Sequence, residues 1–241
     1  IIAPFVFTIV ALTMYGSSSG AFGLYAVLGG GMMGVWGNTL YSSGFAIEFE
    51  KWQGTLEEVL AAPSKLMYVI AGRSLSNAVL GLSNMVGIIL IATILFGVPL
   101  GVANPVVFVV ALVLTVFSVA CLGLIFASAF VLSRSTQILT NGLENPLYIV
   151  SGSMFPIALL PFWTHPVAYA LGPTWGIDAI RLAASADYAT ETFWVGMDVG
   201  AAMALDIGIM LAVSLVYLLI ATALFKAVEK KARTTGSLVE A

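Results

Sequence analysis

Long apolar stretches alternate with short polar ones along most of the chain. A helix needs about 20 consecutive apolar residues to cross the hydrocarbon core of a bilayer, so stretches of this length predict membrane spans. Five have the required length: residues 21–46, 67–97, 105–132, 137–158 and 199–225. Residues 1–14 are apolar but shorter, and the chain begins inside them without a methionine, so we expect the outer part of a first span whose start precedes Ile1. The pattern predicts an all-α, polytopic membrane protein with six transmembrane helices, the first incomplete, in a single domain over residues 1–241.

A polar segment at residues 48–65, EFEKWQGTLEEVLAAPSK, separates the second and third predicted spans. Because polar residues between two spans must lie in water, we expect a loop with its own structure here. Thr55 and Glu58 are spaced as a capping box, in which each side chain bonds the backbone amide of the other residue. The apolar residues that then share one face at helical spacing are Leu56, Val59 and Leu60. Pro63 ends a helix of about two turns, which is too short to be stable alone in water, so it needs a surface: the membrane interface or a partner protein.

The region between the fifth and sixth predicted spans, residues 159–198, is interrupted by prolines and charged residues. These are Pro161, Pro166, Pro173, Asp178, Arg181, Asp187, Glu191 and Asp198. Residues 166–183 are apolar enough to enter a membrane, but their proline and charged side chains argue against a full crossing. We therefore predict short re-entrant or interfacial helices. The expected anchors at the membrane–water interface are Trp163, Trp175 and Trp194.

Composition and charge narrow the class of protein. The chain is 60% hydrophobic and 9% charged, whereas a soluble domain is about 25% charged. With six spans, the basic residues that share one side of the membrane are Lys51, Lys65, Arg73, Arg134, Lys226, Lys230, Lys231 and Arg233, against Arg181 on the other. The positive-inside rule then places residues 48–65, the turn at 133–136 and the C-terminus in the cytoplasm, and residues 156–198 outside. We expect the tail to be frayed from Lys226 onwards. The net charge of −3 says little about nucleic acid, but the sequence lacks a basic patch large enough to bind it, so we expect no nucleic-acid partner.

The sequence carries no arrangement of residues typical of a soluble enzyme, a metal site or a cofactor site. No Gly-Lys dipeptide occurs, so a phosphate-binding GxxxxGK[ST] loop is excluded and we expect this chain not to hydrolyse ATP by itself. The one histidine, His165, is interpreted as a solvated or hydrogen-bonded surface residue. The one cysteine, Cys121, lies in an apolar run, so we expect a packing role and neither an intrachain disulfide nor a cysteine-based metal site.

Two acidic residues, Glu144 and Asp206, lie within predicted spans. A charged side chain in the membrane interior costs about 2.5–3.5 kcal/mol on insertion scales, so such a residue usually faces protein or water. One interpretation is a translocation path in which the carboxylates contact a cationic substrate or an ion. The other is structural: a protonated carboxyl group or a hydrogen bond inside the helix bundle.

Three motifs can be recognised, two at the ends of predicted spans and the third between the fifth and sixth spans. Residues 50–63 read E-K-W-Q-G-T-L-E-E-V-L-A-A-P, close to the pattern E-R-x-x-G-T-L-E-x-L-L-x-x-P, with Lys51 for arginine and Val59 for leucine. Residues 151–161 read S-G-S-M-F-P-I-A-L-L-P, which matches S-G-x-x-F-P-x-x-x-L-P. Residues 172–181 read G-P-T-W-G-I-D-A-I-R and match N-P-L-T-Y…D-A-x-R less closely, because its Asn and Tyr differ. In these motifs and in its predicted topology the chain resembles the membrane (permease) subunits of type-two ABC-type exporters.

The resemblance implies a function and a set of partners. The segment after Thr55 would be a coupling helix that docks on a separate nucleotide-binding ATPase subunit, which would carry the ATP and Mg. The residues implied in coupling are Glu50, Lys51, Gly54, Thr55, Leu56, Glu57, Glu58, Val59, Leu60 and Pro63. Two permeases, as a homodimer or a heterodimer, and two ATPase subunits would pass a drug, lipid, glycan or similar cargo outward across a prokaryotic plasma (inner) membrane. The external lid would include Phe155, Pro156, Pro161, Trp175, Asp178 and Arg181.

Two other classes stay open at this point. A secondary transporter or channel would use Glu144, which stands close to Pro146, and Asp206 as sites near the membrane midplane. An intramembrane enzyme would need paired groups at depth, such as histidine with carboxylates or serine with lysine, and the predicted spans supply none. We therefore expect the chain itself not to be an enzyme.

Overall fold

The computed structural model describes residues 2–15, 20–54, 66–98, 101–132, 142, 145–154, 157, 160–185, 188 and 192–235. Every element assigned within these ranges is a helix, which confirms the all-α class for the described residues. The elements are α1 (Ile2–Tyr15), α2 (Gly20–Gln53), α4 (Leu66–Phe96), α5 (Pro105–Leu132), η2 (Phe162–Thr164), α7 (His165–Ala170), α8 (Gly172–Ala184) and α9 (Val199–Thr235). Residues 145–150 are helical as well.

Three of these helices are long and apolar enough to cross a membrane. The qualifying segments are Met67–Phe96 of α4, Pro105–Ser128 of α5 and Val199–Val228 of α9. Ile2–Thr13 of α1 is apolar but shorter, as the sequence predicts. The described residues thus support an integral membrane protein, and the count of six spans stays a prediction.

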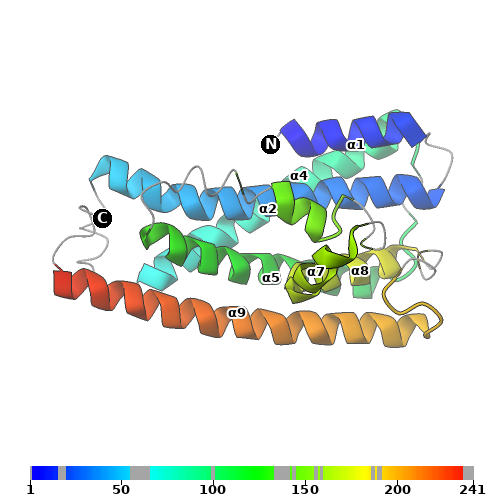
Figure 1. Cartoon of the computed structure of the whole chain (residues 1–241). Coiled ribbons are helices and arrows are strands. Elements are labelled where there is room, and N and C mark those ends of the chain that lie inside the picture. Colours follow the sequence, from blue (N-terminus) through cyan, green and yellow to red (C-terminus); the bar gives the residue numbers. More distant parts are fainter. Residues whose placement is uncertain are drawn as a thin grey trace.

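The long helices lie side by side in one bundle (Figure 1). Helix α2 packs against α1, α4 and α5, and α9 packs against α5. The C-terminal ends of α2, α5 and α9 lie at one end of the bundle, and α7 and α8 lie towards the end where α9 begins (Figure 1). Helix α8 fills the space beside α5, α9 and α2. The segment with α7 and α8, which the charge pattern assigns to the outside, therefore lies at the end of the bundle opposite to the chain's C-terminus.

Small residues let α2 approach its neighbours closely. A Cβ atom on Gly30 would collide with the hydroxyl of Thr8 on α1, and one on Gly34 would lie 3.3 Å from Cβ of Asn84 on α4. The GxxxG pair of this helix therefore packs inside the chain, as such pairs do where helices approach closely in lipid.

The boundaries of two long helices differ from those predicted. Helix α2 does not end near residue 46 but continues to Gln53, so the first part of the polar segment 48–65 extends the helix. The charged residues end the apolar pattern, but they do not interrupt the backbone hydrogen bonds of the helix. The helix ends only at Gly54, which adopts a φ of +71°. Helix α9 likewise runs to Thr235, where a frayed tail was expected from Lys226 onwards. Its last turns are rich in lysine, alanine and arginine, which are strong helix formers, and their positive charges suit a helix C-terminus.

The predicted fifth span, residues 137–158, is also too long at its outer end. The helical residues 145–150 give way to a turn at 151–154, in which Gly152 has a φ of +77°. A residue without a Cβ atom takes this conformation readily, so the helix ends before the turn at residues 151–154, inside the predicted span.

Candidate functional site

Helix α8 is buried along its whole length, and two glycines allow this. A Cβ atom on Gly172 would collide with the hydroxyl of Ser118 on α5. One on Gly176 would collide with the hydroxyl of Thr115 on α5 and lie 2.7 Å from Sδ of Met210 on α9. Every residue of α8 is buried as a result, including its charged residues Asp178 and Arg181.

Both ends of α8 are held by groups from other elements. The amide of Gly172 donates to the hydroxyl of Tyr217 on α9 at 3.2 Å, and this hydroxyl donates to the carbonyl of Ala170. At the other end, the amides of Ala103 and Asn104, just before α5, donate to the carbonyls of Ala184 and Ala183 at 3.1 and 2.9 Å. These bonds satisfy carbonyls that a helix C-terminus otherwise leaves without a partner.

Arg181 joins α8 to the turn at residues 151–154 and to α2. Its Nη1 donates to the carbonyl of Gly152 at 2.8 Å, and its Nη2 donates to that of Ser153 at 3.0 Å. Its guanidinium carbon lies 3.5 Å from the centroid of the Tyr25 ring, a cation–π geometry. The tip of the second motif, S-G-S, and the arginine of the third, D-A-x-R, are therefore bonded directly to one another.

Asp178 is held by two hydroxyl groups from the segment that follows α8. The Tyr188 hydroxyl donates to its Oδ1 at 2.9 Å, and the Thr192 hydroxyl donates to its Oδ2 at 2.5 Å. Burial raises the pKa of the Asp178 carboxyl above its ordinary value, and the bonds from Thr192 and Tyr188 act in the opposite direction. Burial also raises the pKa of the Tyr188 hydroxyl.

The carboxyl group of Asp206 on α9 is close enough to that of Asp178 for the two groups to interact electrostatically. Its Oδ1 accepts a hydrogen bond from the indole of Trp194 at 2.7 Å, while its Oδ2 is buried without a hydrogen-bond partner among the described residues. Asp206 thus adds a second buried acidic group near Asp178.

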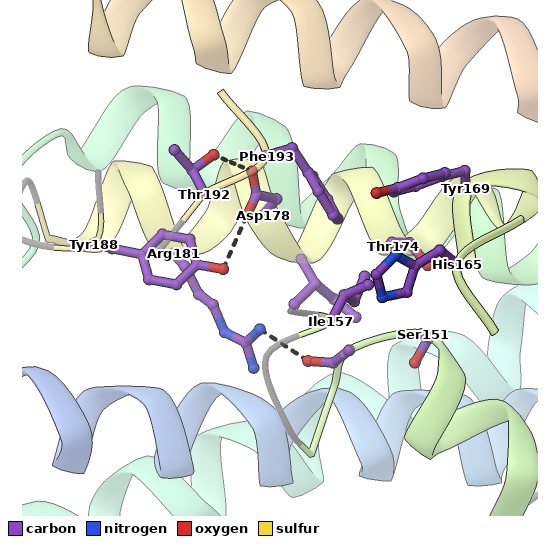
Figure 2. Close-up of a pocket in the computed structure, with 12 residues that line it drawn as sticks. Ser151, Ile157, His165, Tyr169, Thr174, Asp178, Arg181, Tyr188, Thr192 and Phe193 are labelled. Carbon is purple, nitrogen blue, oxygen red and sulfur yellow. Dashed lines mark hydrogen bonds between the residues drawn. The ribbon is translucent and has the colours of Figure 1, made fainter. Parts of the chain in front are cut away.

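A cavity of about 220 Å³ opens beside these charged residues. Its walls come from the turn at 151–154, Ile157, α7, α8 and the segment before α9 (Figure 2). Asp178 lies between Thr192 and Tyr188, the ring of Phe193 lies next to it, and the rings of Tyr169 and His165 lie farther along the cavity (Figure 2). The cavity thus combines an aromatic wall with a buried carboxylate, as ligand sites in proteins commonly do.

The predicted lid residues are brought together only in part. Trp175, Asp178 and Arg181 lie on α8 and are buried, and Pro161 is exposed just before η2. Phe155 and Pro156 lie outside the described residues.

The expected interface anchors also differ. Trp163 is 68% exposed, but Trp175 is only 8% exposed, donates to the carbonyl of Tyr169 and packs against Phe193, and Trp194 binds Asp206. Trp175 is therefore internal because the aromatic cluster covers it, whereas Trp194 is partly buried.

Most of the other predicted site residues fall where the structure gives no side-chain description. Glu50 and Lys51 lie in the last turns of α2, and Gly54 follows it with a positive φ. The rest of the coupling set lies outside the described residues: Thr55, Leu56, Glu57, Glu58, Val59, Leu60 and Pro63. Glu144 lies outside them too. Coupling and translocation by these residues stay predictions.

Sequence reasoning missed three partners of Asp178 and Arg181. Tyr25 stands near the start of an apolar span, and Tyr188 and Thr192 stand in a stretch that contains no recognisable motif. The tip of the second motif carried a signal, as did Trp194, an interfacial aromatic residue, and Asp206, an intramembrane carboxylate. These signals gave unusual positions but not which residues contact one another.

The long apolar helices and the buried polar cluster at one end of the bundle define an integral membrane protein of the polytopic helical class. The family model for the ABC-2 type transporter matches residues 1–184. The chain therefore belongs to the ABC-2 type transporter family, as a transmembrane component of an ABC transporter. No curated protein sequence matches the chain.

Proposed function

We propose that the chain is the permease subunit of an ATP-driven exporter, powered by a separate nucleotide-binding subunit. The observation that carries the proposal is the family match over residues 1–184. It is supported by the direct bonds of Arg181 to the S-G-S turn, which join two motifs of the resemblance. Because the sequence contains no GxxxxGK[ST] loop, we assign ATP hydrolysis, with its Mg, to the partner.

Coupling runs through the segment that follows α2. Because α2 is helical to Gln53, a displacement of residues 55–62 by the ATPase acts directly on the end of a long helix that packs on α1, α4 and α5. ATP binding closes two ATPase subunits, and the coupling helices transmit this closure as rigid-body rocking of the bundles. A drug, lipid, glycan or similar cargo passes outward between two permeases, which form a homodimer or a heterodimer.

The outer segment, with α7 and α8, forms the external end of this path. The C-terminal ends of α2 and α9, with the basic residues of the tail, lie at the opposite end of the bundle (Figure 1). The positive-inside rule puts that end in the cytoplasm of a prokaryotic cell, where the ATPase is available.

The proposal is tested by placing a charge on the predicted docking face. Leu60→Asp buries an unpaired carboxylate in the interface, which costs several kcal/mol, and should release the ATPase or uncouple it. Thr55→Ala is the matched control, because loss of a helix cap costs only about 1 kcal/mol. The measurement is copurification of the ATPase with the permease, with cargo-stimulated ATP hydrolysis read in the same sample. Wild-type copurification and transport by Leu60→Asp would show that the motor does not dock on this segment.

A further inference from the structure

The cavity beside α8 has a wall of aromatic rings that pack on one another. The ring of Phe193 lies 5.5 Å from that of Tyr169, in an edge-to-face arrangement, and 4.9 Å from that of Trp175 behind it. His165 adds a ring 6.0 Å from Tyr169. Aromatic rings present a negative face, so a group of such rings attracts positive charge when water is excluded.

Two charged side chains line the cavity, Asp178 and Arg181. The two terminal nitrogens of Arg181 donate to the carbonyls of Gly152 and Ser153, and its guanidinium covers the ring of Tyr25. The guanidinium is thus held against the turn at 151–154 and α2, which leaves the carboxyl group of Asp178 to face a ligand.

The cavity also holds a polar group without a partner. Thr174 lines the cavity and is 1% exposed, and its hydroxyl has no hydrogen-bond partner among the described residues. Buried polar atoms are nearly always bonded, so such an atom indicates a group that completes the site. A hydroxyl can bond the N–H of a protonated amine or a water that accompanies a quaternary one.

We propose that this cavity is a binding site for a small organic ammonium group, with Asp178 as its counter-charge and the rings of Phe193 and Tyr169 as its aromatic wall. The carboxylate of Asp178 and the faces of the rings attract a cationic group, whereas the same carboxylate repels an anion. The site lies within one subunit, at the end of the bundle where α9 begins. The inference rests on the proposed function only in assigning the cavity to the external side, since binding itself needs neither ATP nor a motor.

The site should bind its ligand more tightly as the pH rises. The raised pKa of Asp178 means that a proton competes with the ammonium group for the carboxylate. The other titratable or charged groups around it are Asp206 from α9, Arg181 from α8, Tyr188 from the following segment, His165 from α7 and Tyr25 from α2. An affinity that rises with pH until Asp178 is fully ionised identifies the carboxylate as the group that titrates.

The test is a binding titration of the full-length permease in phosphatidylglycerol nanodiscs, read by tryptophan fluorescence because Trp175 packs against Phe193. The probe is tetramethylammonium, with tert-butanol as the neutral compound of similar size and sodium chloride as the ionic-strength control. We expect saturable binding of tetramethylammonium, with a Kd on the order of millimolar, and no saturable response to the two controls. An equal response to tert-butanol, or no saturable response to tetramethylammonium, would overturn the proposal.

Variants test whether tetramethylammonium binds in the cavity and not at other acidic residues of the surface. Asp178→Asn keeps oxygen and nitrogen atoms in place of the carboxylate and should weaken binding about tenfold or more, because it removes the buried counter-charge. Phe193→Leu keeps the volume apolar and should weaken binding by about threefold to tenfold through loss of a cation–π contact. The matched control is Asp198→Asn, since Asp198 is an exposed carboxylate that caps the amide of Ala201 at the start of α9. Unchanged affinity in Phe193→Leu, a variant that leaves every polar contact in place, would contradict the proposal even if Asp178→Asn failed to fold.

The ammonium group could belong to a soluble amine or to a lipid headgroup, and a second bilayer separates the two. In phosphatidylcholine nanodiscs a headgroup ligand would occupy the cavity and suppress the tetramethylammonium response. A soluble ligand would leave the response equal in both bilayers. Loss of ATPase copurification in the Leu60→Asp experiment would leave this binding unchanged, so the two proposals fail independently.

Discussion

Removal of the Arg181 side chain tests whether the contact between the two motifs holds the outer segment in place. The arginine is 4% exposed, makes two hydrogen bonds to backbone carbonyls and covers the ring of Tyr25. Arg181→Met removes the charge and both bonds but keeps much of the apolar volume. Arg181→Lys keeps the charge but replaces the planar fork by a single ammonium group, which cannot reach both carbonyls in the same geometry.

The size of the effect follows from these contacts. A hydrogen bond from a charged donor contributes about 1.5–3 kcal/mol, and a desolvated cation–π contact contributes about 2 kcal/mol. The losses do not add fully, because the hydroxyl of Tyr25 still donates to the carbonyl of Gly152 at 3.4 Å. We expect Arg181→Met to lower the free energy of unfolding by about 3–5 kcal/mol, because two charge-assisted hydrogen bonds and the cation–π contact are lost, and Arg181→Lys to lose about half as much.

The assay is reversible unfolding of the purified permease in mixed micelles, followed by circular dichroism as the proportion of denaturing detergent increases. Hydrogen exchange of the amides at residues 151–154 reports on the turn itself and should increase most in Arg181→Met. If this variant unfolds within about 0.5 kcal/mol of the wild type, the range of an ordinary surface substitution, then Arg181 does not hold the outer segment and the reasoning is wrong.

Three further predictions concern topology, packing and the buried carboxyl pair. In a cysteine-free background, a cysteine at Ser135 should be shielded from an impermeant thiol reagent in intact cells and one at Ala189 should be labelled; external labelling of the former would refute the six-span topology. Gly176→Ala should destabilise the protein by about 1–3 kcal/mol through overpacking of α8, measured by the same detergent unfolding, whereas Gly208→Ala, whose added methyl group meets open space, should not. Asp206→Asn keeps an oxygen acceptor for the Trp194 indole and should retain most transport; selective loss of transport of cationic cargo at normal expression would show instead that Asp206 contacts the substrate.

Hydropathy predicts the helical class and the approximate positions of the apolar helices, because each span must satisfy the hydrogen bonds of its own backbone within the membrane. It does not predict where a helix ends once it has left the apolar region. The last turns of α2 and α9 are charged yet helical, because glutamate, lysine and alanine favour a helix in water as well. The end of the helical residues 145–150 depends instead on the conformation of a single residue, Gly152.

Of the candidate site, the sequence predicted the residues on α8 but not their partners on other elements. The spacing of Asp178 and Arg181 in the third motif indicated that both residues matter, and both are buried on α8. Their partners come from distant parts of the sequence: Tyr25 from α2, Gly152 from the turn and Asp206 from α9. Contacts of this kind arise from tertiary packing, and neither periodicity nor composition carries information about them.

The turn before α5 constrains the chain in a way that its own sequence does not reveal. Ala103 and Asn104 are exposed, belong to no helix and connect two apolar helices, so they mark a place where an inserted residue would ordinarily be tolerated. Their amides nevertheless cap the last carbonyls of α8. A tag or an extra residue placed here would remove hydrogen bonds from the end of a helix that lies far along the chain. The length of this turn is therefore constrained by an element that is distant from it in the sequence.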